Sequence, residues 1–283
     1  MSRFERFVAI DWSGAKGKRH KGIAIANCGA DGKAPRLVRP DHVWSRFEVL
    51  DWLVKEAAEV PTLFGFDFSF APPIADRGEY LPGRPEVPVT ARAFWDYVER
   101  HCEDEDLGAA SFLEQSHRPH FYFGIADGVK ADFVHFRRCD ARLNAQGGRK
   151  TASAYDAIGA AQVAKASFSG MRLLHRLSGK VAIWPMDPLP EKDSAVVEIY
   201  TRIYLRAAGL PGMKLRSRVD LNQALAALGS PPARLRFEPN DHQTDALVTA
   251  AGMRSFDAQG EYWSPLGLTP ELARTEGWTF GIR

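Results

Sequence analysis

FVAIDWSG, residues 7–14, decides the fold, because here an apolar strand ends on a carboxylate and runs into a turn. Side chains alternate along a strand, so Phe7, Ala9 and Asp11 share one side of it. A carboxylate inside a packed strand costs free energy unless another group compensates its charge. Asp11 stands at the end of the strand, where a side chain can reach a cleft, and is therefore the first candidate site residue.

Three further segments place an acid where a packed apolar stretch ends or begins. They are LFGFDFSF with Asp67, AVVEIY with Glu198, and NDHQTDALVTAA with Asp241 and Asp245. If the strands of Asp11 and Asp67 are parallel neighbours, their carboxylates converge at one sheet edge, where open α/β sheets bind ligands. Asp241 and Asp245 are four residues apart on a predicted helix, so both can point the same way.

Clustered carboxylates repel one another and need positive charge between them. Hard divalent cations prefer oxygen ligands, and Mg²⁺ combines a few carboxylates with water and substrate phosphates. A pair of such ions can activate water and stabilise the leaving oxygen of a phosphodiester. We therefore expect Mg²⁺ or Mn²⁺ to be bound by Asp11, Asp67, Asp241 and Asp245. The expected catalytic residues are Asp11, Asp67, Glu198 and Asp245.

The remaining sequence favours an α/β protein of one domain, residues 1–283, with an irregular insertion at about 76–150. Two apolar stretches joined by a short turn, 7–11 and 20–27, favour an antiparallel pair. Ser45 and Glu48 have the spacing of a helix capping box. We expect a mixed sheet of about five strands, the second antiparallel to the rest. Further strands are predicted at 37–44, 63–68, 181–184 and 195–200, and helices at 47–58, 91–102, 154–177, 217–228 and 241–256.

Composition limits the classes of protein. The chain has 283 residues, of which 45% are hydrophobic, enough for a sizeable core. It has no apolar run of roughly 18 residues, so we expect no membrane span. The start, MSRFERFVAIDW, lacks the apolar region of a signal peptide. The 3 cysteines are far apart, which favours a reduced, cytoplasmic setting.

The net charge is only +2, but the charges are unevenly distributed. Residues 41–127 hold 17 acidic and 7 basic residues, a net of −10. Residues 130–180 hold 10 basic and 3 acidic residues, and residues 201–236 hold 7 and 1, giving +7 and +6. The basic blocks can form a face for a nucleic-acid backbone. The alternative is that acidic and basic segments pack beside one another.

Two other groups of residues are candidates for binding a ligand, one for a phosphate and one for zinc. Lys16, Lys18 and Arg19 lie in the turn after Asp11 and are candidates for binding a substrate phosphate, although the turn lacks P-loop spacing. A solvated turn is the alternative. The pattern of His117, His120, His135 and Cys139 could hold zinc, whereas ordinary packed or surface histidines are the favoured explanation.

The order of the acidic segments resembles the ribonuclease H-like superfamily: a strand Asp in a β-hairpin, a strand Asp, a strand Glu and an Asp-bearing C-terminal helix. More narrowly, the chain is similar to the domain-of-unknown-function 429 family over residues 7–283, least so over 76–150. The motifs that carry this similarity are FVAIDWSG, GFDFSFAPP, GAAQVAKASFSGMRLLHRL followed by VAIWP, VVEIYTRIY, DHQTDALVTAAG and EGWTFGIR. The resemblance implies a ribonuclease H fold and a nuclease activity. It implies an acidic site at Asp11, Asp67, Glu198 and Asp245, with Asp241 adjacent.

Each acid also has a purely structural interpretation. Asp11 can cap its turn, Glu198 can pair with Arg202 or another arginine, and Asp241 can complement the helix dipole. Two other functions therefore stay open beside the nuclease. One is a nucleotide-dependent phosphotransferase of the actin-like or sugar-kinase type, and the other is a nucleic-acid-binding module without chemistry. The sequence leaves the oligomeric state open.

Overall fold

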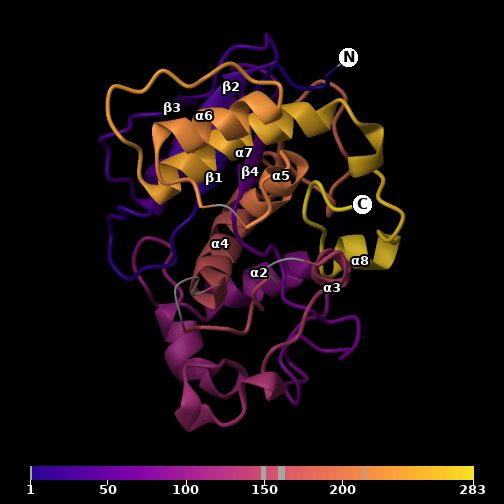
Figure 1. Cartoon of the computed structure of the whole chain (residues 1–283). Helices are drawn as coiled ribbons and strands as arrows, with labels where there is room; N and C mark the ends of the chain where they lie inside the picture. Colours follow the sequence, from indigo (N-terminus) through magenta and orange to yellow (C-terminus); the bar gives the residue numbers. More distant parts are fainter. Residues whose placement is uncertain (1, 148–150, 159–162, 213) are drawn as a thin grey trace.

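The centre of the molecule is a six-stranded mixed sheet with strand order β3-β2-β1-β4-β6-β5 (Figure 1). The structure, a computed structural model, describes residues 2–147, 151–158, 163–212 and 214–283. β1 is antiparallel to β2, and β2 to β3, whereas β1, β4, β6 and β5 run parallel. The strands are β1 (Arg6–Asp11), β2 (Ala24–Gly29), β3 (Arg36–Leu37), β4 (Thr62–Phe66), β5 (Ala182–Ile183) and β6 (Ala195–Glu198).

This arrangement confirms an α/β protein with a mixed sheet whose second strand is antiparallel. The sheet has six strands rather than about five, since all six predicted segments contribute a strand, and β5 is a two-residue edge strand beside β6. The third strand, expected at 37–44, is only Arg36–Leu37. The chain turns away at Arg39, whose φ is +49°, and Pro40 has no amide hydrogen for a ladder.

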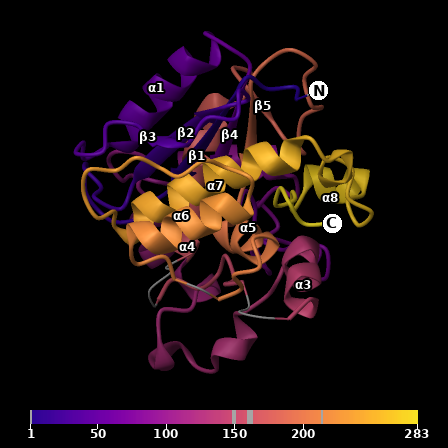
Figure 2. The same ribbon diagram turned by 45° about the horizontal axis from the view of Figure 1, so that its top comes forward.

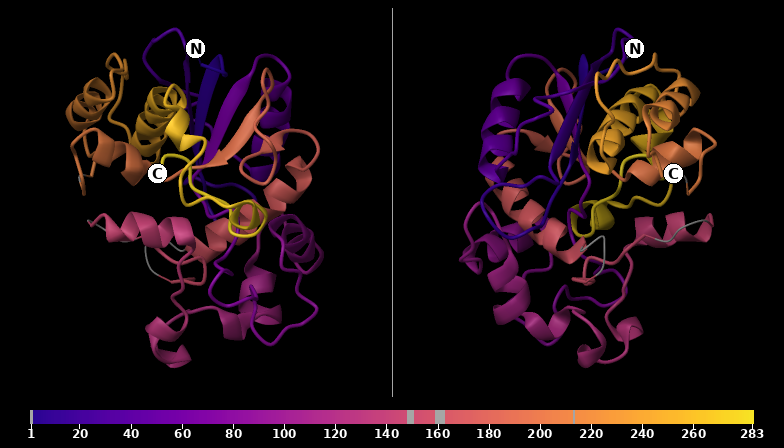
Figure 3. Two further views of the ribbon diagram at one scale, coloured as in Figure 1. Left: turned by 90° about the vertical axis from the view of Figure 1, so that its right-hand side faces the viewer. Right: turned by 60° about the vertical axis from the view of Figure 1, so that its left-hand side comes forward.

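Helices cover both faces of the sheet (Figures 2 and 3). Alternation along β1 sends Val8 and Ile10 into a core shared with α1 and α4, and Phe7 and Ala9 into a core shared with α5, α6 and α7. We call these the α4 face and the α7 face. Their helices are α1 (Arg46–Ala57), α4 (Val163–Leu177), α5 (Thr201–Ala207), α6 (Arg218–Ala227) and α7 (Asp241–Asp257).

Capping fixes where the main helices begin. Ser45 and Glu48 form the predicted capping box before α1. Asn240 and Gln243 form another before α7, so the first turn of α7 is held rigidly against the end of the preceding loop. The helix predicted at 154–177 is observed from Val163. Its predicted start is wrong, because residues 154–158 form a turn and a bridge between Asp156 and Tyr122, and residues 159–162 lie outside the described residues.

A lobe, defined here as residues 76–147, lies below the carboxyl ends of the central strands (Figures 1 and 3). Its helix α2 packs against α4, and its aromatic side chains Phe112 and Phe121 are buried in the α4-face core rather than exposed. Its helical segments are α2 (Ala91–Arg100), α3 (Arg138–Ala145) and short turns at Phe112–Ser116, Arg118–His120, Ile125–Asp127 and Lys130–Asp132.

The C-terminal segment returns to the sheet after α7. It contains a short turn at Gly260–Tyr262 and α8 (Pro270–Arg274), and Thr279 then pairs in parallel with Glu198 at the end of β6. No helix formed by the described residues is long and apolar enough to cross a membrane. Cys28, Cys102 and Cys139 are free thiols.

Candidate functional site

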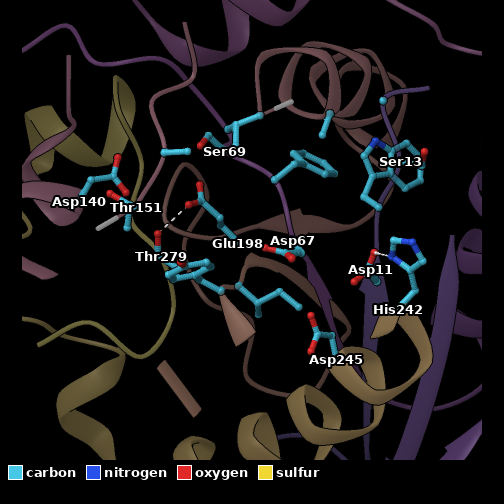
Figure 4. Close-up of a pocket in the computed structure, with 18 of the residues that line it drawn as sticks. Asp11, Ser13, Asp67, Ser69, Asp140, Thr151, Glu198, His242, Asp245 and Thr279 are labelled. Atoms are coloured by element: carbon cyan, nitrogen blue, oxygen red, sulfur yellow. Dashed lines mark hydrogen bonds and ion pairs between the residues drawn. The ribbon is translucent and has the colours of Figure 1, made fainter. Parts of the chain in front are cut away.

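A pocket of about 450 Å³ opens at the carboxyl edge of the sheet, between the strand ends, the first turns of α7 and the lobe (Figure 4). All five sequence-predicted acids line it, as do a histidine and an arginine that the sequence did not single out. The acids are Asp11, Asp67, Glu198, Asp241 and Asp245. Residues more than 200 positions apart in the chain are therefore brought to one place, which is what a shared site requires.

Asp11 and Asp67 meet because β1 and β4 are parallel neighbours. Ile10 is opposite Phe66 in the register, and the amide of Asp67 donates to the carbonyl of Ile10 over 3.2 Å. Asp11, the last residue of β1, alternates with Ala9, and Asp67, directly after β4, alternates with Gly65, so both carboxylates belong to the α7 face. Among the described residues, none donates a hydrogen bond to the carboxylate of Asp67.

The first two turns of α7 supply the other half of this acidic group. Asp241 and Asp245 lie one turn apart, as the sequence predicted, and Asp241 is exposed at the mouth of the pocket. Between them His242 directs its ring at the strand end, with Nδ1 3.0 Å from Oδ1 of Asp11. This is an ion pair when His242 is protonated.

Burial and mutual repulsion raise the pKa values of the acids on the α7 face. Burial is the main cause for Asp67, whose pKa is raised well above its usual value, and the charges of Asp11 and Asp245 add to it. Burial, followed by the charge of Asp11, raises the pKa of Asp245 to about 7. The pKa of Asp11 is raised by burial, which outweighs its hydrogen bond with His242. The same hydrogen bond raises the pKa of His242.

Glu198 faces away from these aspartates. It is level with Phe66 in the register, so it shares the parity of the α4 face, opposite to that of Asp11 and Asp67. Its carboxylate is 3% exposed and makes a two-pronged ion pair with Arg137. Figure 4 shows it directed toward Thr279 rather than toward Asp67. The sequence analysis expected Glu198 to pair with Arg202 or with another arginine, and its partner here is Arg137. The catalytic role of Glu198 stays a prediction.

The turn after Asp11 is fixed by contacts that hold the pocket wall in place. Arg46, fully buried, donates to the carbonyls of Ser13 and Ala15 over 2.7 Å. Gly14 packs against the backbone of α4, where a Cβ would lie 2.2 Å from the amide nitrogen of Ala166. Only glycine fits there, so the small residue in DWSG serves close packing.

The cations predicted to bind substrate do not line this pocket. Lys16 and Lys18 are instead paired with acids of the lobe, at 2.6 Å from Glu114 and 3.1 Å from Glu105. Arg19 pairs with Glu48 of α1. These pairs support the alternative of a solvated turn, and the substrate-binding role of the three cations stays a prediction.

The residues considered for zinc do not form a ligand set. His117 is buried with Nε2 3.0 Å from the hydroxyl of Tyr97, and His135 bonds to the carbonyl of Asp132. Cys139 is buried on α3, and burial raises its thiol pKa. Within the described ranges, no three His, Cys, Asp or Glu side chains are arranged as a ready metal-binding group.

The acidic pocket nevertheless has the donor chemistry of a divalent-cation site. Asp11, Asp67 and Asp245 offer carboxylate oxygens, the donors that hard divalent cations prefer, and the charges of Asp11 and Asp245 add to burial in raising the pKa of Asp67. His242, when protonated, is the ion-pair partner of Asp11. Asp11, Asp67 and Asp245 are the residues that would hold a divalent cation, which would supply positive charge among them.

Two residues of the pocket escaped sequence reasoning. His242 carried a signal, since it lies within DHQTDA beside the two predicted aspartates. Arg137 carried none that points to Glu198, because it lies 61 positions earlier in an irregular segment. No family model, curated protein or solved structure matches this chain. The resemblance to the domain-of-unknown-function 429 family therefore stays a prediction.

Proposed function

We propose that this protein is a divalent-metal-dependent nuclease that hydrolyses phosphodiester bonds of nucleic acid at the pocket of Asp11, Asp67 and Asp245. The observation that carries the proposal is the convergence of these three half-buried carboxylates on one pocket, where burial and neighbouring charges raise their pKa values. Such an arrangement is unfavourable without a cation and becomes favourable when one is bound.

We assign each residue a role from its place in the pocket. Asp11, Asp67 and Asp245 would hold Mg²⁺ or Mn²⁺, and Asp241 at the pocket mouth would assist by orienting water. The bound ion supplies charge neutralisation at the phosphate and a more acidic water. Glu198, paired with Arg137 on the other face, supports the pocket wall. The fixed turn at Ser13–Ala15 keeps Asp11 in register with Asp67.

A second candidate is favoured by one observation. The pocket volume of about 450 Å³ lies within the range of roughly 300–1,000 Å³ that holds a small ligand. A nucleotide-dependent phosphotransferase would use the same carboxylates to bind a metal–nucleotide complex. ATP binding measured by calorimetry in Mg²⁺ distinguishes this candidate, because a nuclease of long strands has no need for it.

The test is cleavage of single-stranded, duplex, hybrid and branched nucleic acids with Mg²⁺ or Mn²⁺. Asp67→Asn is expected to lower the rate by at least about 10–100-fold, the loss that even the outer-shell partners of a metal site cause. Asp51→Asn is the matched control, an exposed acid on α1. Absence of cleavage of every substrate by well-folded wild-type protein, or full activity of Asp67→Asn, would contradict the proposal.

A further inference from the structure

A second groove, of about 740 Å³, lies between the edge strand β3 and the segment that joins α6 to α7. Four cations and one acid line it: Lys33, Arg36, Arg234, Arg236 and Asp41. The two arginines of the joining segment belong to the basic block at 201–236. This block therefore forms part of a spatial patch. We call it the basic groove.

The charge of the basic groove is largely uncompensated. Lys33 is 2.7 Å from Asp31 and is partly neutralised. Arg36, Arg234 and Arg236 are exposed, and within the described part of the chain none of the three has an ion-pair partner. By contrast, Lys16, Lys18 and Arg19 are all paired. Unpaired guanidinium groups that converge on one groove are suited to bind phosphates.

An aromatic side chain lies among these cations. Phe237 lines the basic groove and is 38% exposed, one of few large apolar side chains at the surface. An exposed ring beside a basic track can stack on an unpaired base, whereas the bases of a duplex present only their edges. The combination of cations and ring therefore favours a single strand.

The basic groove connects to the carboxylate pocket through the first turn of α7. Pro40 and Asp41 line both the basic groove and a smaller hollow beside it. Asn240 and Gln243 also line that hollow, and Nε2 of Gln243 donates to the carbonyl of Pro40 over 3.2 Å. Asp241 and His242, from the same turn, line the carboxylate pocket. Lys21 and Arg39 add two cations along the hollow.

We propose that the basic groove binds the sugar–phosphate backbone of a single nucleic-acid strand whose neighbouring segment enters the carboxylate pocket. This inference rests on the proposed function for what happens in the pocket, but the contacts in the groove need no metal. It assigns Arg36, Arg234 and Arg236 to phosphates and Phe237 to a base. The strand would pass along the first turn of α7.

The experiment measures fluorescence anisotropy of a labelled single strand of about 20 nucleotides, longer than the roughly 4–16 that one single-strand-binding fold covers. Binding is followed in EDTA over a range of salt for wild type, for Arg234→Gln/Arg236→Gln and for Lys180→Gln/Lys192→Gln. The lysine pair is the control, because these exposed cations precede β5 and β6 at the opposite edge of the sheet.

We expect the arginine variant to bind about ten-fold more weakly and to lose about 1.4 from the slope of log K against log salt, at about 0.7 per phosphate contact. The lysine variant should match wild type, and Phe237→Leu should weaken the single strand more than a duplex. The inference is overturned if wild type binds no strand, if the arginine variant binds like wild type, or if the control loses as much.

Cleavage of a small chromogenic phosphodiester separates this inference from the proposed function. Such a substrate reaches only the carboxylate pocket, so its hydrolysis with Mn²⁺ should be the same in wild type and the arginine variant. Arginine-dependent strand binding without any cleavage would support the groove and refute the nuclease. Cleavage with strand binding that ignores the arginines would support the nuclease and refute the groove.

Discussion

Arg137 holds Glu198 with two parallel hydrogen bonds, from Nη1 to Oε2 over 2.6 Å and from Nη2 to Oε1 over 2.5 Å. Both side chains are almost completely buried. The same carboxylate accepts the amide of Phe70 and the hydroxyl of Thr279. Its oxygens are thus occupied by four donors from the lobe, the segment after β4 and the C-terminal segment. Glu198 therefore links the lobe, the segment after β4 and the C-terminal segment to the end of β6.

The Arg137–Glu198 pair should therefore matter for stability. Removing one partner leaves a buried charge uncompensated, so Arg137→Met should lower the free energy of unfolding by about 3–5 kcal/mol. Arg137→Met/Glu198→Gln should recover part of that loss, because neither buried charge of the pair remains. Urea unfolding of the two single variants and the double variant measures the coupling. If the loss of unfolding free energy in the double variant equals the sum of the losses in the two single variants, the two side chains do not interact.

Divalent cations should stabilise the protein through the α7-face aspartates. At Mg²⁺ or Mn²⁺ about 100-fold above the Kd, binding adds about 2.7 kcal/mol to the free energy of unfolding and raises the melting temperature. Asp67→Asn should lose this increase, whereas Glu198→Gln should keep it although its melting temperature starts lower. Thermal unfolding with and without metal measures this difference. A wild type that no cation stabilises would favour the binding module without chemistry.

Without metal, the aspartates should make stability fall as pH rises. An acid whose pKa is higher in the folded protein binds more protons there than in the unfolded chain, so unfolding becomes easier as pH rises between the two values. For Asp245 this window runs from about 4, the unfolded value, to about 7. Asp245→Asn should flatten the pH dependence and add on the order of 2 kcal/mol at pH 7.

The measurement for Asp245 is urea unfolding in EDTA at several pH values across this window. Asp51→Asn, in an exposed position on α1, is the control and should leave the slope as in wild type. His242 acts in the same direction, because its raised pKa stabilises the fold below about 6.5, its unfolded value, and this stabilisation is lost as pH rises through the folded value. His242→Ala should therefore remove the part of the fall that lies above about 6.5. An unchanged slope in Asp245→Asn would remove Asp245 from the charge cluster.

Gly14 should be intolerant of even one added methyl group. A Cβ there would lie 2.2 Å from backbone atoms of Lys165 and Ala166, which cannot move without shifting α4. Gly14→Ala should cost about 1–3 kcal/mol, the range for overpacking, and should displace the turn that carries Asp11. Gly260→Ala is the control, because no atom lies within 4 Å of its added Cβ. Similar melting temperatures for the two variants would show that the turn is more adaptable than the packing indicates.

The sequence predicted the parts of the fold that depend on local pattern. The strand at Phe7–Asp11, the capping box of Ser45 and the helix from Asp241 all follow from alternation, spacing and caps within a few residues. The convergence of Asp11 and Asp67 also followed, because parallel neighbouring strands end at the same edge. Asp245 joins them because α7 packs against β1 and β2, a tertiary contact that no local pattern encodes.

The missed features depend on register and on distant partners. Glu198 ends a strand as Asp11 does, but its register with β4 sends it to the other face, and no local pattern encodes that register. Lys16 lies near Asp11 in sequence, yet its partner Glu114 is 98 positions away. The short third strand depended on a positive φ at Arg39, a residue type that does not signal such a turn.

Glu276 ties the pocket together from the far end of the chain. Its carboxylate accepts the amides of Ile74 and Ala75 after β4 and the amide of Arg138 at the start of α3. One carboxylate therefore fastens the chain near both ends of the lobe, at residues 74–75 and at Arg138, to the C-terminal segment, so neutralising that single side chain would loosen the lobe at two points at once.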